Sequence, residues 1–146
     1  MVARAATGMK RVLFLCTHNS ARSQMAEALL RQAAAGRFAV ESAGTEPGAL
    51  HPLAVRAMAE LGVDISSQRS KGVSRFVEER FDYVITVCDE AGERCPVFPA
   101  AARQLHWSLP DPSAARGSEA ERLAAFRDVR DRLASLISEF LLGAER

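Results

Sequence analysis

The sequence lacks long hydrophobic runs and has few aromatic residues. Aromatic side chains make up 6% of its 146 residues, with one tryptophan and one tyrosine. The longest apolar run near the N-terminus, 12–16, is far shorter than the roughly 20 residues of a membrane span, and it is also too short for a signal-peptide core. We therefore expect a protein that is neither membrane-spanning nor exported, and we place it in the cytoplasm.

The chain also lacks an excess of either charge. Its 19 basic and 18 acidic residues leave a formal net charge of +1, so no polyanion or membrane surface is implied as a partner. A hydrophobic share of 48% and a charged share of 25% are typical of a globular domain. The length suits one domain, and we assign it to residues 10–146 after a flexible lead-in of residues 1–9.

There are only three cysteines, Cys16, Cys88 and Cys95. In a reducing cytosol, thiols serve chemistry more often than structural cross-links. A zinc site needs about four ligands at familiar spacing, and the six-residue gap between Cys88 and Cys95 has no histidine pair beside it. We predict no metal site. Core packing and thiol exchange remain open as explanations for the pair.

The order of predicted elements indicates an α/β fold. Because strands alternate with helices, we expect a single domain with a four-stranded parallel sheet and helices on both faces. Ligands of such sheets bind outside the carboxyl ends of the strands, where Cys16, Cys88 and Asp111 should converge. The predicted strands are 11–16, 38–42, 81–87 and about 104–107; the predicted helices are about 20–36, 51 or 52–61, 74–80 and 118–142, and His51 reads as a helix-start residue.

The segment between the first strand and first helix carries the strongest chemical signal. Unpaired N–H groups and the dipole at a helix N-terminus bind anions, and the same field stabilises a thiolate. Arg22 offers a planar fork for two oxygens of a phosphate-like ion, and Ser23 can donate to the sulfur. We predict an oxyanion loop with Cys16 as nucleophile, formed by Thr17, His18, Asn19, Ser20, Ala21 and Arg22. Since this loop contains no glycine, Asn19 should adopt the unusual backbone conformation.

Two further features can complete a reaction. Asp111, followed by Pro112, offers a carboxyl group near the loop as general acid, although Asp-Pro turns are also common in ordinary loops. A continuous helix from Cys88 to Cys95 would separate their Cα atoms by about 10 Å, whereas a disulfide tolerates less than about 7 Å. A bond between them would therefore require this segment to unwind, which Gly92 and Pro96 would ease.

These motifs resemble a known family. Cys16-x5-Arg22-Ser23 together with Asp111-Pro112 resembles the low-molecular-weight protein tyrosine phosphatases. The three cysteines, within Val87-Cys88-Asp89 and Cys95-Pro96-Val97-Phe98-Pro99, and His106-Trp107 resemble more specifically the thioredoxin-coupled arsenate reductases built on that fold. The resemblance covers the chain from about residue 10 to residue 142.

The resemblance implies a three-step relay. Cys16 attacks arsenate while Asp111 protonates the departing oxygen, Cys88 then attacks Cys16 and releases arsenite, and Cys95 moves the disulfide to the Cys88–Cys95 pair. Thioredoxin supplies the reducing equivalents, no cofactor is tightly bound, and a monomer suffices. Some family members bind potassium beside the loop, and Asn19, Glu27 and Ser42 match part of that site. Arg69 and Lys71 oppose a cation there, and Lys71 can itself neutralise Glu27, so we predict no ion.

Three alternatives stay open. A phosphatase would form a phosphocysteine at Cys16, but Ser113-Ala114-Ala115 follow the Asp-Pro where phosphatases of this fold carry aromatic residues. A non-enzymatic phosphocarrier or arsenic-binding module would not need Arg22, Asp111 and two further cysteines on one rim. A low-molecular-weight thiol could replace thioredoxin as reductant.

Overall fold

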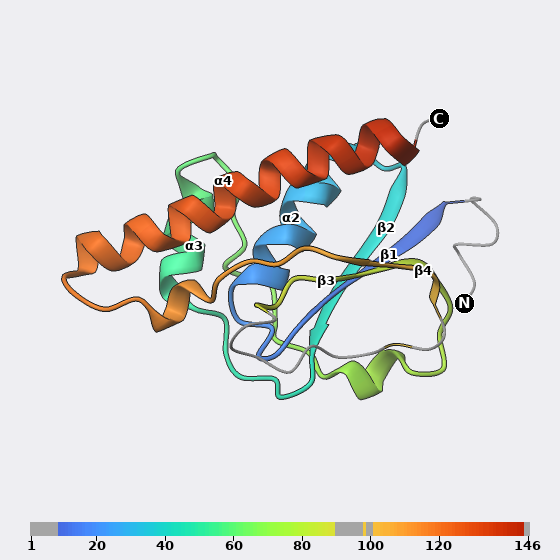
Figure 1. The fold of residues 1–146 in the computed structure, drawn as a ribbon, viewed down its shortest axis with the longest axis horizontal. Helices are drawn as coiled ribbons and strands as arrows, with labels where there is room; N and C mark the ends of the chain where they lie inside the picture. Colours follow the sequence, from blue (N-terminus) through green and yellow to red (C-terminus); the bar gives the residue numbers. More distant parts are fainter. Residues whose placement is uncertain (1–8, 90–97, 99–100, 145–146) are drawn as a thin grey trace.

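A parallel four-stranded sheet forms the centre of the protein. The computed structural model describes residues 9–89, residue 98 and residues 101–144. Its strands are β1 (Lys10–Cys16), β2 (Phe38–Gly44), β3 (Phe81–Thr86) and β4 (Ala101–His106), in the order β2-β1-β3-β4 (Figure 1). Every neighbouring pair is parallel, as predicted. The carboxyl ends of β1 and β2 lie level, because Cys16 pairs with Gly44.

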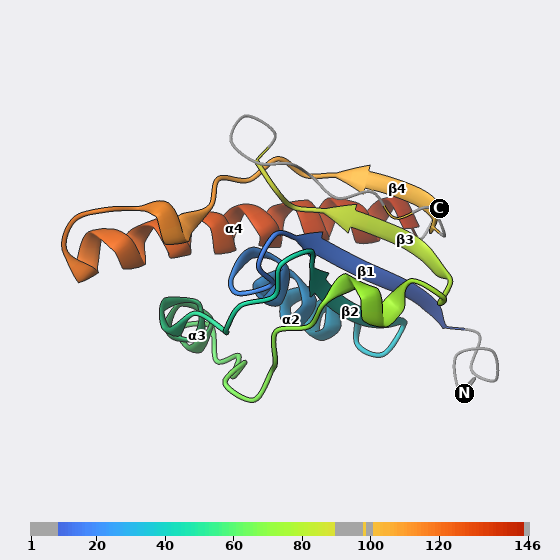
Figure 2. The ribbon, with the colours of Figure 1, turned by 90° about the horizontal axis from the view of Figure 1, so that it is seen from below.

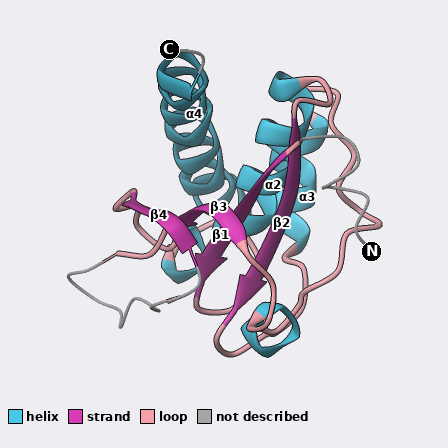
Figure 3. Ribbon diagram, turned by 90° about the vertical axis from the view of Figure 1, so that its right-hand side faces the viewer, coloured by secondary structure: helices cyan, strands magenta, loops and turns pink. Residues whose placement is uncertain are grey.

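In the part of the chain that the structure describes, three α-helices and two short 3-10 helices connect and cover these strands. The α-helices are α2 (Arg22–Ala34), α3 (Pro52–Ala59) and α4 (Glu119–Ala144), and the 3-10 helices are η1 (Val73–Phe76) and η2 (Pro112–Ala114) (Figure 3). The predicted helix 74–80 is thus a single 3-10 turn. Among the described residues, no helix combines the length and apolar character needed to cross a membrane.

The central strand β1 is buried on both faces. Its alternate residues Val12, Phe14 and Cys16 belong to a core cluster shared with α2, α3 and α4. Leu13 and Leu15 belong to a second cluster on the other face. Fully burying a leucine side chain contributes about 1.5–3 kcal/mol, so this short strand fixes both layers to the sheet.

Helical elements cover both faces of the sheet, but they differ in kind. In Figure 1 α4 runs along the top and α2 and α3 lie below it, to the left of β2, whereas η1 lies at the bottom. Figure 2 gives the perpendicular view of the same layers. Phe76 of η1 packs with Phe81 and Phe98 under the second face. The predicted four-stranded sheet with helices on both faces is confirmed, the second cover being a 3-10 turn.

The edge strand β4 begins earlier than its sequence pattern predicts. Ala101 pairs with Phe81, and Arg103 pairs with Tyr83. The strand therefore begins at residue 101, three residues before the predicted start at 104. An edge strand faces solvent along one side, and most β4 side chains are exposed. The first half of β4 therefore shows no alternation of apolar and polar residues, and only its backbone pairing with β3 identifies it as a strand.

Candidate active site

Cys16 lies at the base of the loop between β1 and α2. It is the last residue of β1, its side chain is buried, and Arg22 opens α2 six residues later. The Asn19 backbone N–H donates to the Cys16 sulfur at 3.2 Å, and the Ser23 hydroxyl lies 2.8 Å from the same atom. Because the Asn19 amide donates to the Ser23 oxygen at 2.7 Å, the Ser23 O–H can point at the sulfur. The backbone N–H of Asn19 and the hydroxyl of Ser23 are therefore both placed to donate to the sulfur of Cys16.

Asn19 holds the loop in its unusual conformation. Its φ of 52° confirms the predicted left-handed backbone. The side-chain oxygen accepts from the Lys71 backbone N–H at 2.7 Å and from Gln24 at 3.0 Å. The side-chain nitrogen donates to Ser23 and, at 2.9 Å, to the Ser42 hydroxyl. A buried amide with all of these partners fixes both the loop and the direction of each hydrogen bond.

The other predicted loop residues are held by their backbone. Thr17, His18 and Ser20 accept hydrogen bonds through their carbonyl oxygens from residues of the segment that follows β2. These donors are Glu46 at 2.8 Å, Gly48 at 3.0 Å and His51 at 2.9 Å. Ala21 is the N-cap of α2 and is buried. Residues 44–51 therefore run along one side of the loop and hold it by backbone hydrogen bonds; we call this segment the rail.

Sequence reasoning missed Gly44, the last residue of β2. A Cβ atom at this position would lie 2.5 Å from the Thr17 carbonyl oxygen and 2.9 Å from the Asn19 nitrogen. In the sequence, this glycine lies just beyond the predicted strand 38–42. No signal in the sequence marks it, because its role comes from the pairing of Gly44 with Cys16 at the level ends of β2 and β1. Its missing side chain lets the oxyanion loop lie directly against the end of β2.

Arg22 and Asp111 come together from opposite ends of the sequence. Arg22 is only 3% exposed, and its Nη1 donates to the Leu109 carbonyl oxygen at 3.0 Å. Its Nη2 lies 3.9 Å from Asp111 Oδ2. The other oxygen of Asp111 accepts from Ser113 N–H and O–H, at 2.9 and 2.7 Å. The guanidinium is therefore held rigidly, with the carboxyl group beside it.

Cys88 lies next to the end of β1. The Val87 N–H donates to the Leu15 carbonyl oxygen at 2.9 Å, which continues the β1–β3 pairing to the residue before Cys88. Cys88 is fully buried and disulfide-bonded, whereas Cys16 is a free thiol, so the two are not joined. Cys95 lies outside the described residues, as do Gly92 and Pro96 of the segment predicted to unwind.

The residues that match a potassium site do not fit a free cation. The Lys71 ammonium lies 3.5 Å from Glu27 Oε1, and the Arg31 guanidinium lies 2.6 Å from Glu27 Oε2. Both carboxylate oxygens thus already face a positive charge. Within the described ranges, no cluster of three or more histidine, cysteine or acidic side chains could hold a metal ion.

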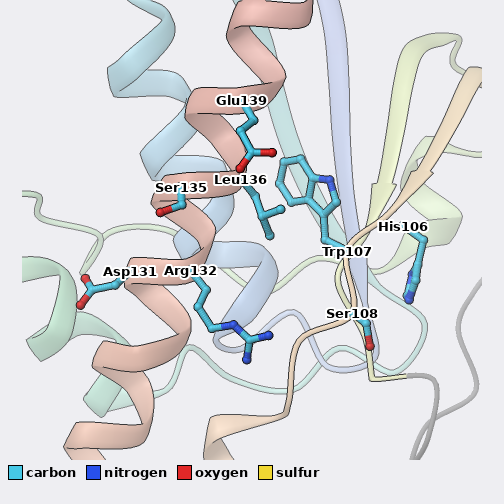
Figure 4. Close-up of a pocket in the computed structure, with 8 residues that line it drawn as sticks. All are labelled: His106, Trp107, Ser108, Asp131, Arg132, Ser135, Leu136 and Glu139. Atoms are coloured by element: carbon cyan, nitrogen blue, oxygen red, sulfur yellow. The ribbon is translucent and has the colours of Figure 1, made fainter.

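A separate groove lies between the end of β4 and α4. Its volume is about 560 Å³, and Trp107, Arg132 and Glu139 are among its lining residues (Figure 4). None of the predicted site residues lines it. At its edge the His106 ring pairs with Thr86 through a 2.7 Å hydrogen bond, which ties β4 to β3. The groove is therefore distinct from the oxyanion loop.

His51, whose backbone N–H donates to the Ser20 carbonyl oxygen of the oxyanion loop, is expected to make the stability of the protein depend on pH. It caps α3, as its predicted helix-start role requires, because its Nδ1 accepts from the Leu53 N–H at 3.0 Å. Its ring packs on Phe126 at 4.7 Å between centroids. Burial lowers the pKa of His51 below 6.5; Arg122 lowers this pKa further, and Asp111 opposes the shift.

We therefore expect stability to fall as pH drops below the unfolded-state pKa. Between the two pKa values the unfolded chain binds more protons, so acid favours unfolding. Thermal melts at about pH 7.5 and about pH 5.5 should show a smaller pH difference for His51→Asn, which keeps a capping acceptor, than for the unsubstituted chain. His106→Asn is the control and should retain the full difference. An unchanged pH difference in His51→Asn would contradict the assignment.

Comparison with known proteins identifies the family of this chain. The family model described as low molecular weight phosphotyrosine protein phosphatase matches residues 11–145. The chain belongs to that family. The Bacillus subtilis arsenate reductase is 42% identical to this chain over 131 residues, which cover 90% of this chain and 94% of that protein.

Solved structures of the phosphatase fold agree. A structure of an arsenate reductase in the phosphate binding state superposes with a TM-score of 0.78 and 34% identity, covering 92% of this chain and 98% of the other. The thioredoxin-dependent arsenate reductase of Corynebacterium glutamicum has a TM-score of 0.64 and 31% identity, covering 96% of this chain and 68% of the other. This family member therefore lies close to arsenate reductases in both sequence and fold.

Proposed function

We propose that the protein reduces arsenate to arsenite by a three-cysteine relay that thioredoxin recycles, as a monomeric cytoplasmic enzyme of arsenic detoxification with no tightly bound cofactor. The observation that carries the proposal is the free thiol of Cys16, which has two hydrogen-bonding neighbours beside Arg22. Cys88 follows the adjacent strand end in disulfide-bonded form. The arsenate reductase relatives add support from sequence.

The first step joins the sulfur to arsenic. The oxyanion loop and Arg22 bind arsenate, and the Cys16 thiolate forms an S–As bond. Asp111, held 3.9 Å from Arg22, gives its proton to the departing oxygen, which leaves as water. Arsenic stays pentavalent. Phosphate and sulfate would compete for the same loop because they are also tetrahedral oxyanions.

The second and third steps carry out the reduction. The Cys88 thiolate attacks the Cys16 sulfur, the electron pair of the S–As bond passes to arsenic, and trivalent arsenite leaves. Cys95 then attacks Cys88, which frees the Cys16 thiolate and moves the disulfide to the Cys88–Cys95 pair. Thioredoxin reduces that disulfide, so two electrons enter for each arsenite released. A free Cys16 with an oxidised Cys88 is the state expected after the third step.

The phosphatase alternative receives less support. The turn η2 after Asp111 carries Pro112, Ser113 and Ala114 and offers no aromatic wall for a phenol ring. We expect at most weak hydrolysis of aryl phosphates. A phosphocarrier or arsenic-binding module would not require a general acid held beside Arg22.

Replacing each resolving cysteine tests the relay. With thioredoxin, thioredoxin reductase and NADPH, the unsubstituted chain should release arsenite over many turnovers. Cys88→Ser should release none, because nothing can attack the Cys16 adduct. Cys95→Ser should release about one equivalent and stop at a Cys16–Cys88 disulfide, since no thiol remains to resolve it. Quenched-flow arsenite measurement and mass spectrometry of trapped disulfides check both results.

The same assay separates the alternatives. A parallel reaction with glutathione and glutaredoxin in place of thioredoxin identifies the reductant class, and a p-nitrophenyl phosphate assay measures the phosphatase activity. Multiple turnovers in both Cys88→Ser and Cys95→Ser would overturn the relay. Arsenate binding without arsenite release in the unsubstituted chain would favour the binding module.

A further inference from the structure

A buried carboxylate lies behind the oxyanion loop. Glu27 is on α2, and its side chain is 5% exposed. The Ser42 hydroxyl of β2 donates to Glu27 Oε1, and Arg31, which is half exposed, pairs with Oε2. A carboxylate in such a place is costly unless its charge is compensated and its oxygens are hydrogen-bonded.

Hydrogen bonds connect this carboxylate to the nucleophile. The Glu27 carboxylate oxygens can only accept hydrogen bonds, so the Ser42 hydroxyl donates to Glu27. The Ser42 oxygen in turn accepts from Asn19 Nδ2 at 2.9 Å. The same Asn19 nitrogen donates to Ser23 Oγ at 2.7 Å, which lies 2.8 Å from the Cys16 sulfur. Glu27 thus orients the Ser42 hydroxyl and the Asn19 amide orients Ser23, so the hydrogen bonds from Glu27 to Cys16 form one continuous chain.

Lys71 holds this network at both ends. Its ammonium lies 3.5 Å from Glu27 Oε1 and donates to the Arg69 carbonyl oxygen at 3.1 Å. Its backbone N–H donates to Asn19 Oδ1 at 2.7 Å, and its carbonyl oxygen accepts from the Gly44 N–H at 2.9 Å. The Lys71 side chain is only 11% exposed. One residue thus fixes both the Asn19 amide and the buried carboxylate.

A second acidic side chain increases the need for positive charge in this region. Burial raises the pKa of Glu41, which precedes Ser42 on β2, and the charge of Glu27 raises it further. Lys71, Arg31 and Arg75 act in the opposite direction. Of the two cations paired directly with Glu27, Lys71 is the more deeply buried, so water screens its charge less.

We propose that Lys71 is a positioning residue that serves as a tethered monovalent cation, compensating Glu27 and making the Cys16 loop independent of free potassium. The inference uses the site of the proposed function, but it concerns the reactivity of Cys16 and not the identity of the oxyanion. A tethered ammonium is always present at its site, so the loop needs no ion from solution. The Lys71 ammonium thereby supplies the positive charge at the residues that match a potassium site.

The chain offers a matched control because it has only two lysines, Lys71 and Lys10. Lys10 is exposed at the opposite end of β1 from Cys16. In a Cys88→Ser, Cys95→Ser background, only Cys16 reacts with iodoacetamide, and no arsenate is needed. Lys71→Ala should slow alkylation about 5- to 10-fold at fixed pH, because Ser23 no longer points reliably at the sulfur. Lys10→Ala should leave the rate unchanged.

The dependence of the alkylation rate on potassium distinguishes this role from a merely structural one, which potassium would not restore. Lys71→Ala opens space for a free ion, so KCl should restore its alkylation rate to within about twofold of the parent, relative to choline chloride at equal concentration. The parent should not respond to potassium. Glu27→Gln combined with Lys71→Ala should also recover, because an uncharged amide needs no cation. Thermal melts of each variant establish that it is folded.

Three outcomes would overturn the inference. They are an alkylation rate in Lys71→Ala equal to that of the parent, equal potassium dependence in both, or a slow rate that neither potassium nor Glu27→Gln corrects. Each is separable from the proposed function, since alkylation involves no arsenate. Loss of arsenate reduction with the Lys71 effect intact would reject only the substrate, and the reverse pattern would reject only the role of Lys71.

Discussion

Replacing Arg22 with lysine is expected to lower kcat/KM for arsenate by about 10²–10³-fold. Lysine keeps the charge but loses the planar fork that can hold two oxygens of one ion. It also cannot both keep the hydrogen bond to the Leu109 carbonyl oxygen and reach the oxyanion, as the guanidinium can. Steady-state arsenite release with thioredoxin recycling gives the value, and sulfate competition separates lost binding from lost turnover.

A second arginine gives the matched control. Arg56 is half exposed and pairs with Glu119 at 2.5 Å, away from the loop. Arg56→Lys should keep kcat/KM within about twofold, because exposed ion pairs contribute little. Equal activity of Arg22→Lys and Arg56→Lys would show that Arg22 has no part in oxyanion binding.

Replacing Gly44 with alanine is expected to lower arsenate reduction about 100-fold and to destabilise the fold by about 1–3 kcal/mol. The added Cβ would stand 2.5 Å from the Thr17 carbonyl oxygen, closer than real Cβ contacts occur. The neighbouring atoms are backbone and cannot rotate aside, so the loop must move and its donors leave the Cys16 sulfur. Chemical denaturation and Cys16 alkylation measure the two effects.

Gly48→Ala is the control for that change. Gly48 belongs to the same rail, but an added Cβ would meet only the His18 Cβ, at 4.0 Å, an ordinary contact. Its activity and stability should stay close to those of the unsubstituted chain. If Gly44→Ala behaved like Gly48→Ala, the close approach of β2 to the loop would not matter for reactivity.

Local chemistry made much of the site predictable. The nucleophile, Arg22, Ser23 and the left-handed Asn19 follow one another within eight residues, so the strand, loop and helix that hold them could be identified from one short segment. The position of Asp111 near the oxyanion loop was also predicted, because parallel strands place their carboxyl ends at one edge. In the structure, Asp111 Oδ2 lies 3.9 Å from Nη2 of Arg22 at the end of that loop.

Other features depended on contacts between distant segments. Gly44 matters because the loop lies against its backbone, and a missing side chain carries no chemical signal in sequence. The early start of β4 depended on pairing with β3 at an exposed edge, where hydrophobic alternation is not required. Likewise, the sequence indicated that the charge of Lys71 opposes a bound cation. Only the packing of residues 69–71 against α2 brings the Lys71 ammonium to Glu27.

The sequence by itself determined the parallel fold, the oxyanion loop and the chemical types of its reactive groups, because these follow from periodicity and short-range motifs. Tertiary structure alone decided how that loop is supported. Gly44 lies against Thr17, residues 44–51 run along the loop, and a chain of hydrogen bonds through Ser42, Asn19 and Ser23 links Glu27 to Cys16. These interactions depend on distance and hydrogen-bond direction between segments far apart in sequence, which only the folded chain defines.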